Sequence, residues 1–244
     1  MRSMLTSFPE PITACVFGAS GGIGAAFVEL LAADPAVKTV HAGARSPIRA
    51  TAKIQPFAFD LTDEASIAAA SAEIGKLDLI LIATGMLHDE AFQPEKSFRA
   101  QSPEAYARAF AINATGPALI GKHFLPLLPR DRRCVFAALS ARVSSVSDNR
   151  LGGWHAYRAA KAALNMILRN FAVELGRTHK DAVIAGLHPG TVATPLSEPF
   201  QRNVEPVKLF TAEFSATQML AVIDTLTPAD SGNLFAYDGQ RIDF

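Results

Sequence analysis

The chain has 244 residues, of which 49% are hydrophobic, and its 23 Lys and Arg residues balance its 23 Asp and Glu residues. This length and apolar content suit a single α/β domain with a large core, which we place over residues 1–244. A net charge near zero gives no electrostatic basis for binding nucleic acid or an anionic membrane surface, and no apolar run approaches the ~20 residues of a membrane span.

The first element in chain order is a short apolar run at 12–17, which predicts a strand. It ends in the sequence GASGGIG, and a helical pattern follows at 25–33. A strand, a glycine-rich turn and a helix in this order are typical of a dinucleotide-binding site. Glycines let a pyrophosphate approach the helix N-terminus, where free N–H groups favour an anion. The residues of this turn that we expect to contact a cofactor are Gly18, Ser20, Gly22, Ile23 and Gly24.

A second strand is predicted at 37–43, and its end lies about 20 residues beyond the glycine turn. Sites that prefer NAD carry an acidic residue at this strand end, whereas an arginine accommodates the 2′-phosphate of NADP. Here Arg45 follows the strand and no carboxylate does. Arg45 therefore favours NADP, with the Ser20 hydroxyl beside the same phosphate. The alternative is that Arg45 is an ordinary solvated loop charge.

The rest of the chain continues to alternate strands and helices. A strand is predicted at 54–59, and Thr62 is expected to cap the helix that follows. The continuous apolar run at 77–83 has the length of a strand that is covered on both faces. This alternation predicts a doubly wound, parallel Rossmann sheet of about seven strands with helices on both faces. The remaining strands are predicted at 132–139, 181–187 and 233–237, with a tail at 238–244 outside the sheet.

One amide stands out in the middle of the sequence. A long helix is predicted to begin at Ser102, with Pro103 at its permitted first position, and its apolar side carries Asn113. A buried amide without partners costs about 1–3 kcal/mol. Asn113 therefore forms either an ordinary hydrogen bond from helix to loop, or it braces the backbone and holds a water at a functional site.

The stretch WHAYRAAKAAL at 154–164 places Tyr157 and Lys161 one helical turn apart on the same face of an Ala-rich helix. A tyrosine loses its proton near pH ~10, so it is a poor acid or base at neutral pH unless the phenolate is stabilised. Lowering that pKa by about three units takes roughly 4 kcal/mol, which Lys161 supplies only with help from strong desolvation or from a second positive charge such as an oxidised nicotinamide. Taken alone, the pair is equally explained as an accident of an amphipathic helix.

The segment 195–210 contains prolines and mixed polarity without clear periodicity. We expect it to be a mobile substrate lid. Trp154, His155 and Phe200 are candidate walls of a pocket, with plain packing around the tyrosine helix as the alternative.

The cysteines and histidines give weaker indications. Cys15 and Cys134 both fall in predicted buried strands, so we expect free thiols and a cytoplasmic location. The six histidines show no paired spacing of metal ligands, so we expect no metal site.

Several of these pieces, taken together, resemble the short-chain dehydrogenase/reductase family over nearly the whole chain. They are the GASGGIG turn, Asp60-Leu61, Ala83-Thr84-Gly85, Asn113, Tyr157 with Lys161, and the sequence PGTVAT. The run SDNRLGGWHAYRAAKAALN is especially similar to the branch that contains C-factor-like proteins and carbonyl reductases.

The resemblance implies an NADP-dependent oxidoreductase that interconverts a small-molecule carbonyl compound and an alcohol, as a homodimer or homotetramer. Tyr157 would be the proton donor or acceptor, and Lys161 would bind the nicotinamide ribose and lower the pKa of Tyr157. Asn113 would help to hold a water in a proton relay. The cofactor contacts expected beyond the glycine turn are Arg45, Asp60, Leu61, Ala83, Thr84, Gly85, Tyr157, Lys161, Pro189, Gly190, Val192 and Thr194.

The sequence departs from the family pattern at three places. Phe17 stands where a threonine usually precedes the first glycine, and Ile82-Ala83-Thr84-Gly85 replaces the usual Asn-Asn-Ala-Gly. Ala141 takes the second place of a serine pair whose second member orients the substrate oxygen. Ser140, shifted by one residue, is our catalytic candidate, and Ser144, thirteen residues before Tyr157, is its rival.

Two other functions fit the same scaffold. The Ala141 departure and the C-factor similarity suggest a regulatory or signalling protein that binds NADP with little turnover. An isomerase or dehydratase would instead form product with no net change in the cofactor.

Overall fold

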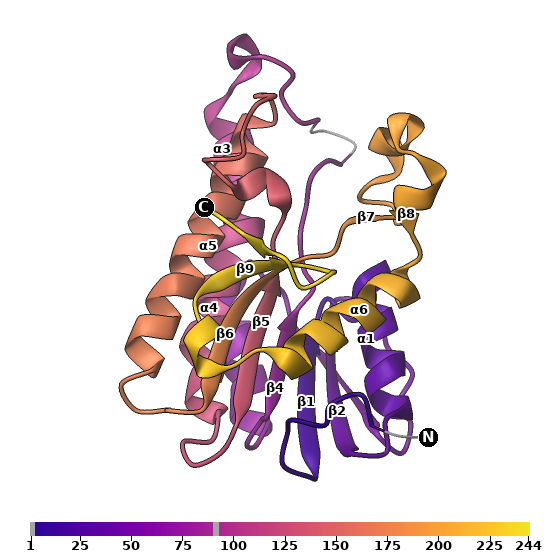
Figure 1. The fold of residues 1–244 in the computed structure, drawn as a ribbon, viewed down its shortest axis with the longest axis vertical. Coiled ribbons are helices and arrows are strands. Elements are labelled where there is room, and N and C mark those ends of the chain that lie inside the picture. Colours follow the sequence, from indigo (N-terminus) through magenta and orange to yellow (C-terminus); the bar gives the residue numbers. More distant parts are fainter. Residues whose placement is uncertain (1–2, 90–92) are drawn as a thin grey trace.

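The computed structural model describes residues 3–89 and 93–244, and it is built around one sheet with the strand order β10-β9-β6-β5-β4-β1-β2-β3 (Figure 1). Every neighbouring pair is parallel except β10 and β9. The strands are β1 (Ile12–Phe17), β2 (Val37–Ala44), β3 (Ile54–Ala58), β4 (Leu79–Ile82), β5 (Cys134–Leu139), β6 (Ala182–His188), β9 (Asn233–Ala236) and β10 (Arg241–Ile242).

Helices cover both faces of this sheet (Figure 1). On one face α1 packs beside α6, over a core that includes Val16 and Leu81. On the other face α2, α4 and α5 cover a core that includes Phe17 and Ile80. Seven parallel strands between two helical layers confirm the predicted doubly wound fold. The helices are α1 (Gly22–Ala33), α2 (Glu64–Glu73), α3 (Pro103–Phe110), α4 (Gly116–Phe124), α5 (His155–Leu175) and α6 (Ala212–Thr225).

The tail at 238–244 adds an eighth strand that the sequence analysis left outside the sheet. Asp238 and Gly239 form a tight turn, with Gly239 at a φ of +83°, and β10 then runs antiparallel to β9. An Asp-Gly pair is a hairpin signal because glycine adopts positive φ without strain. Ile242, which is 4% exposed, is buried by this pairing.

The cap of α2 also differs from the expectation. Asp63 is the N-cap and accepts a hydrogen bond from the Ala65 N–H at 3.0 Å. Thr62 instead donates its hydroxyl to the Asp60 carboxylate at 2.7 Å. Because the Thr62 hydroxyl is bound to Asp60, it does not cap the helix. Asp63 caps it instead, and the helix begins one residue later than predicted.

The long helix that begins at the Ser102 cap is interrupted by a π-helical turn, Ala111–Thr115, between α3 and α4. Pro117 follows this turn and has no N–H, so one carbonyl of the turn lacks its helical donor. Such π turns are frequent at functional sites, and Asn113 lies within this one.

A separate two-stranded sheet joins the two ends of the segment 195–210. Its strands are β7 (Thr191–Val192) and β8 (Leu209–Phe210), which pair in parallel. The pairing of β7 with β8 therefore holds the two ends of the segment together. In the described part of the chain, no helix is long and apolar enough to cross a membrane.

Candidate active site

A cleft of about 470 Å³ lies where the strand order reverses, at the carboxyl ends of β1, β2, β3 and β4. This edge is where open α/β sheets bind ligands, and the volume lies within the range typical of ligand pockets. The cleft lining comprises Gly18, Ser20, Gly21, Ala44, Arg45, Phe59, Asp60, Leu61, Thr62, Ala83, Thr84, Gly85, Met86, His88, Asp89, Arg108 and Ile112.

The glycine turn allows close backbone approach at the floor of the cleft. Gly18 has a φ of +82°, and a Cβ there would lie 2.9 Å from the Ala83 carbonyl carbon. A Cβ at Gly24 would lie 2.1 Å from the Gly18 carbonyl oxygen, so Gly24 serves the close packing of α1 against the turn. The Thr84 hydroxyl beside this turn is buried without a protein hydrogen-bond partner. A glycine cradle and an unsatisfied hydroxyl both fit a polar ligand in this cleft.

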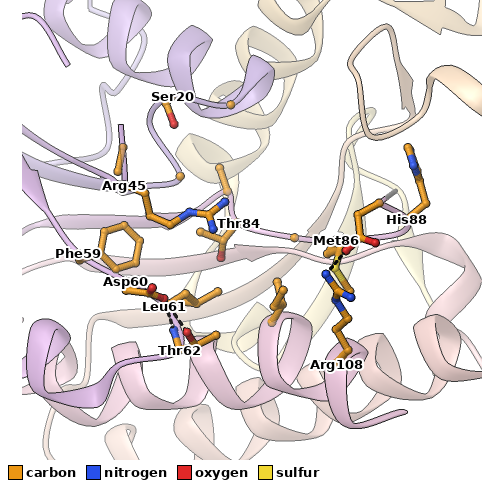
Figure 2. Close-up of a pocket in the computed structure, with 17 residues that line it drawn as sticks. Ser20, Arg45, Phe59, Asp60, Leu61, Thr62, Thr84, Met86, His88 and Arg108 are labelled. Atoms are coloured by element: carbon orange, nitrogen blue, oxygen red, sulfur yellow. Dashed lines mark hydrogen bonds and ion pairs between the residues drawn. The ribbon is translucent and has the colours of Figure 1, made fainter. Parts of the chain in front are cut away.

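The residues at the β2 and β3 ends of the cleft carry its charge. Figure 2 shows the Arg45 side chain extended across the cleft toward Thr84, with Ser20 on one side and Asp60 and Leu61 on the other. Hydrogen bonds from the Thr62 N–H and hydroxyl lower the pKa of Asp60, with Arg45 adding to the effect. Arg45 is exposed to solvent, so its guanidinium is free to bind an anion that enters the cleft.

Asn113 braces the backbone that follows β4. Its Oδ1 accepts from the Met86 N–H at 3.1 Å, and its Nδ2 donates to the Met86 carbonyl at 2.8 Å. The side chain is fully buried. A Cβ at Gly85 would lie 3.4 Å from Asn113 Oδ1 and 3.6 Å from Lys161 Nζ. The cleft floor at Gly85 thus faces both Asn113 and Lys161.

Tyr157 and Lys161 lie on the buried face of α5, one turn apart, as predicted. Lys161 Nζ donates to the Leu139 carbonyl at 2.8 Å and lies 5.9 Å from the centroid of the Tyr157 ring. Burial raises the pKa of Tyr157 well above its usual value and lowers the pKa of Lys161 to about 7. The resemblance implies that Lys161 lowers the pKa of Tyr157 together with a bound nicotinamide, and that role stays a prediction.

The two candidate serines belong to one buried network. Ser140 Oγ donates to Asn165 Oδ1 at 2.7 Å, and Asn165 Nδ2 donates to Ser144 Oγ at 2.7 Å. Ser144 Oγ donates in turn to the Ala141 carbonyl at 2.6 Å. Asn165, one turn beyond Lys161, had no role in the sequence analysis, because only packing brings it to this loop.

The start of α5 is held by a buried carboxylate. The Glu95 carbonyl accepts from the Trp154 N–H at 2.5 Å, and Glu95 Oε2 lies 3.3 Å from the Ala156 N–H nitrogen. Trp154 has a left-handed φ of +51°, which is uncommon for a large side chain. Glu95 is 4% exposed. Its contacts with Trp154 and Ala156 fix the turn that leads into Tyr157.

Phe200 of the segment 195–210 meets residues from two other parts of the chain. Its ring centroid lies 4.9 Å from that of Trp154 and 5.7 Å from that of His88. His88 Nε2 lies 3.1 Å from the carbonyl oxygens of both Pro195 and Leu196. The segment is thereby closed against the tyrosine helix and the loop after β4.

The residues after β6 contact the glycine turn from the other side. A Cβ at Gly22 would lie 2.7 Å from Thr194 Cγ2, so Thr194 abuts the turn directly. Gly190 has a φ of +75° and packs against the Phe210 ring, while the Pro189 carbonyl accepts from Ser215. Val192 is buried in β7. Of the predicted PGTVAT residues, Thr194 thus lies beside the glycine turn, whereas Pro189 and Gly190 pack against Ser215 and Phe210.

The cleft lining and the predicted cofactor residues overlap in part. They share Gly18, Ser20, Arg45, Asp60, Leu61, Ala83, Thr84 and Gly85. Predicted residues outside the lining are Gly22, Ile23, Gly24, Tyr157, Lys161, Pro189, Gly190, Val192 and Thr194.

Several residues of the lining were not predicted from the sequence. Phe59 and Met86 directly adjoin predicted residues, so adjacency to them was an available signal. Arg108, which forms an ion pair with Asp89 at the far end of the cleft (Figure 2), gave no signal, because it lies on the exposed side of α3. His88 also could not be predicted from a local pattern, because its partners, residues 195–196 and Phe200, are far away in the sequence.

Comparison with known proteins bears on this architecture. Residues 12–205 match the short chain dehydrogenase family. An uncharacterized oxidoreductase of Schizosaccharomyces pombe is 27% identical over 94% of this chain and 96% of its own. The C-signal protein of Myxococcus xanthus is 37% identical over 56% of this chain and 76% of its own. The crystal structure of an NADPH-bound carbonyl reductase from chicken fatty liver has a TM-score of 0.82 at 23% identity, covering 98% of this chain and 97% of the other. The chain therefore belongs to the short-chain dehydrogenase/reductase family of oxidoreductases.

Proposed function

We propose that the protein is an NADPH-dependent carbonyl reductase whose proton donor is Tyr157. The observation that carries this proposal is the position of Gly85, which lines the cleft and also lies against Lys161 and Asn113. Gly85 lies between the cleft and the helix of Tyr157, which supports the proposal that the two form one site.

The residues of the cleft fit a dinucleotide phosphate. Gly18 and the start of α1 offer N–H groups to a pyrophosphate, and Asp60 with Leu61 borders the adenosine end. Arg45 and Ser20 would bind a 2′-phosphate, and Thr84 would donate its unpartnered hydroxyl to the cofactor. Thr194 and its neighbours would line the nicotinamide end. NADPH bound here would supply the hydride for a carbonyl carbon.

Tyr157 carries its proton at neutral pH, as burial raises its pKa further above that pH, and it would donate this proton to a carbonyl oxygen. Burial lowers the pKa of Lys161 to about 7, and its ammonium form would stabilise the phenolate that remains after the transfer. Asn113 keeps the Met86 backbone, and with it Gly85, in place.

The segment 195–210 serves this reaction as a substrate lid in the proposal. Phe200 closes over Trp154, whose ring centroid lies 6.3 Å from that of Tyr157. A closed apolar cover excludes water and strengthens the interactions around a carbonyl oxygen.

A two-part experiment tests the proposal. Fluorescence titration of the purified protein with NADPH and NADH should show tight binding that favours NADPH. Turnover of aldehydes, ketones and quinones should then fall by about 10²–10⁴ in the Tyr157→Phe variant, with NADPH affinity retained. Binding without turnover of any such compound would instead support the regulatory alternative. Near-normal turnover in Tyr157→Phe would remove Tyr157 from the mechanism.

A further inference from the structure

The loop after β5 carries two serines, Ser140 and Ser144, whose hydroxyls already donate hydrogen bonds within the protein. The Ser140 hydroxyl donates a hydrogen bond to Asn165 Oδ1, and the Ser144 hydroxyl donates one to the Ala141 carbonyl. The two hydroxyl oxygens are 3.4 Å apart, and Ser144 also accepts from Asn165 Nδ2. A hydroxyl has one proton to donate, so in this arrangement neither serine has one left for a substrate oxygen.

The network is also shielded. Ser140, Ser144 and Asn165 are 4%, 3% and 4% exposed. Freeing either hydroxyl would leave a buried amide oxygen or backbone carbonyl without its donor, which costs about 1–3 kcal/mol. Ala141, between the two serines, is partly exposed, but its side chain has no donor.

The network connects the loop to the face of α5 that carries the Tyr157 and Lys161 pair. Tyr157, Lys161 and Asn165 follow one another at intervals of four residues, so they lie along one side of the helix. The Ser140 N–H bonds to the Leu187 carbonyl on β6, and Lys161 bonds to the Leu139 carbonyl one residue earlier. Asn165 and Lys161 therefore secure consecutive residues at the end of β5.

We infer that Ser140, Ser144 and Asn165 form a positioning unit that fixes the end of β5 against α5, and that Tyr157 holds the substrate oxygen without a serine donor. This inference rests on the proposed carbonyl reduction. The proton that the new alcohol oxygen needs comes from the Tyr157 hydroxyl. Ser140, our catalytic candidate from the sequence, and its rival Ser144 both become positioning residues.

The existence of the network is tested without any substrate. Urea unfolding of Ser140→Ala, Asn165→Ala and the double variant forms a double-mutant cycle. Because the two residues share one buried hydrogen bond, the double variant should lose little more stability than the less stable single variant. Additive losses would show that the two residues do not interact, and the inference would be wrong. This measurement remains valid even if no carbonyl substrate is found and the proposed reduction fails.

The role of the serines is tested by turnover. Removing a side chain that donates to a reacting oxygen typically lowers kcat by about 10²–10³. We expect Ser140→Ala and Ser144→Ala to lower kcat by less than about tenfold, while Tyr157→Phe loses at least about a hundredfold. A loss of about a hundredfold in either serine variant, with the fold and NADPH affinity intact, would assign that serine to the substrate oxygen and overturn the inference.

A variant that adds a hydroxyl tests whether the substrate oxygen lacks a serine donor. Ala141→Ser restores the hydroxyl that the family resemblance implies for the substrate oxygen, at a partly exposed position. We expect kcat to rise with little change in KM, because the oxygen gains a second donor mainly in the transition state. An unchanged kcat would mean that the substrate oxygen already has its second donor, which contradicts the inference.

Discussion

Trp154 and Phe200 meet edge to face, with ring centroids 4.9 Å apart and an interplanar angle of 61°. The contact joins the start of α5 to the segment 195–210, and Trp154 is the single tryptophan of the chain. Intrinsic tryptophan fluorescence therefore reports directly on whether this segment is closed.

Phe200→Ala should open the segment over the active site. The edge-to-face pair is worth about 0.5–1.5 kcal/mol beyond its buried area, and the variant loses it. We expect the Trp154 emission to shift toward that of a solvated indole and KM for carbonyl substrates to rise. Phe98→Ala is the matched control, because Phe98 is 64% exposed. An emission spectrum unchanged in Phe200→Ala would mean that the segment does not rest on Trp154 in solution.

Lys161 should lower stability at neutral pH, as buried charges do. Burial moves its pKa from 10.5 in the unfolded chain to about 7 in the folded one. Between these pH values the unfolded state binds more protons, so this contribution to stability rises with pH across the window and is least favourable at and below pH 7.

Lys161→Met keeps the length of the side chain and removes the charge. Removal of the buried charge should raise the free energy of unfolding at neutral pH, partly offset by the about 1–3 kcal/mol lost when the Leu139 carbonyl has no donor, and turnover should be abolished. The gain should shrink toward pH ~10, where the wild-type lysine folds uncharged. Lys38→Met, on the exposed side of β2, is the control. Urea midpoints across this pH range provide the measurement, and a gain independent of pH would contradict the buried-charge explanation.

Arg45 should determine the choice between the two nicotinamide cofactors. If its guanidinium pairs with a 2′-phosphate, Arg45→Ala should weaken NADPH binding about tenfold or more, the equivalent of about 1.4 kcal/mol, and leave NADH binding nearly unchanged. Arg49→Ala, an exposed arginine outside the cleft lining, should leave both affinities as they are. Equal losses of affinity for NADPH and NADH would mean that Arg45 contacts a part of the cofactor other than the 2′-phosphate.

Gly24 should tolerate no side chain. An added Cβ lies 2.1 Å from the Gly18 carbonyl oxygen, which forces α1 away from the turn. We expect Gly24→Ala to cost about 1–3 kcal/mol of stability and to weaken NADPH binding, since both depend on this packing. Gly75→Ala is the matched control, because a Cβ at Gly75 meets nothing within 4 Å. Equal denaturation midpoints for the two variants would rule out the steric explanation.

Features that depend on local spacing could be predicted from the amino-acid sequence. The glycine turn between β1 and α1, the buried run of β4 and the four-residue interval from Tyr157 to Lys161 are all readable as periodicity, and the fold that they predict is confirmed. The Asp-Gly hairpin before β10 was readable by the same means, but the sequence analysis overlooked it.

Which polar groups from distant segments form hydrogen bonds with one another depends on the tertiary structure. A sequence shows that Ser140, Ser144 and Asn165 are present, but not that one amide binds both hydroxyls. It likewise does not show that Glu95 holds the start of α5, nor that Phe200 reaches Trp154. Hydrogen-bond partners are set by which atoms meet within about 3 Å, and that depends on the packing of the whole chain rather than on any local pattern.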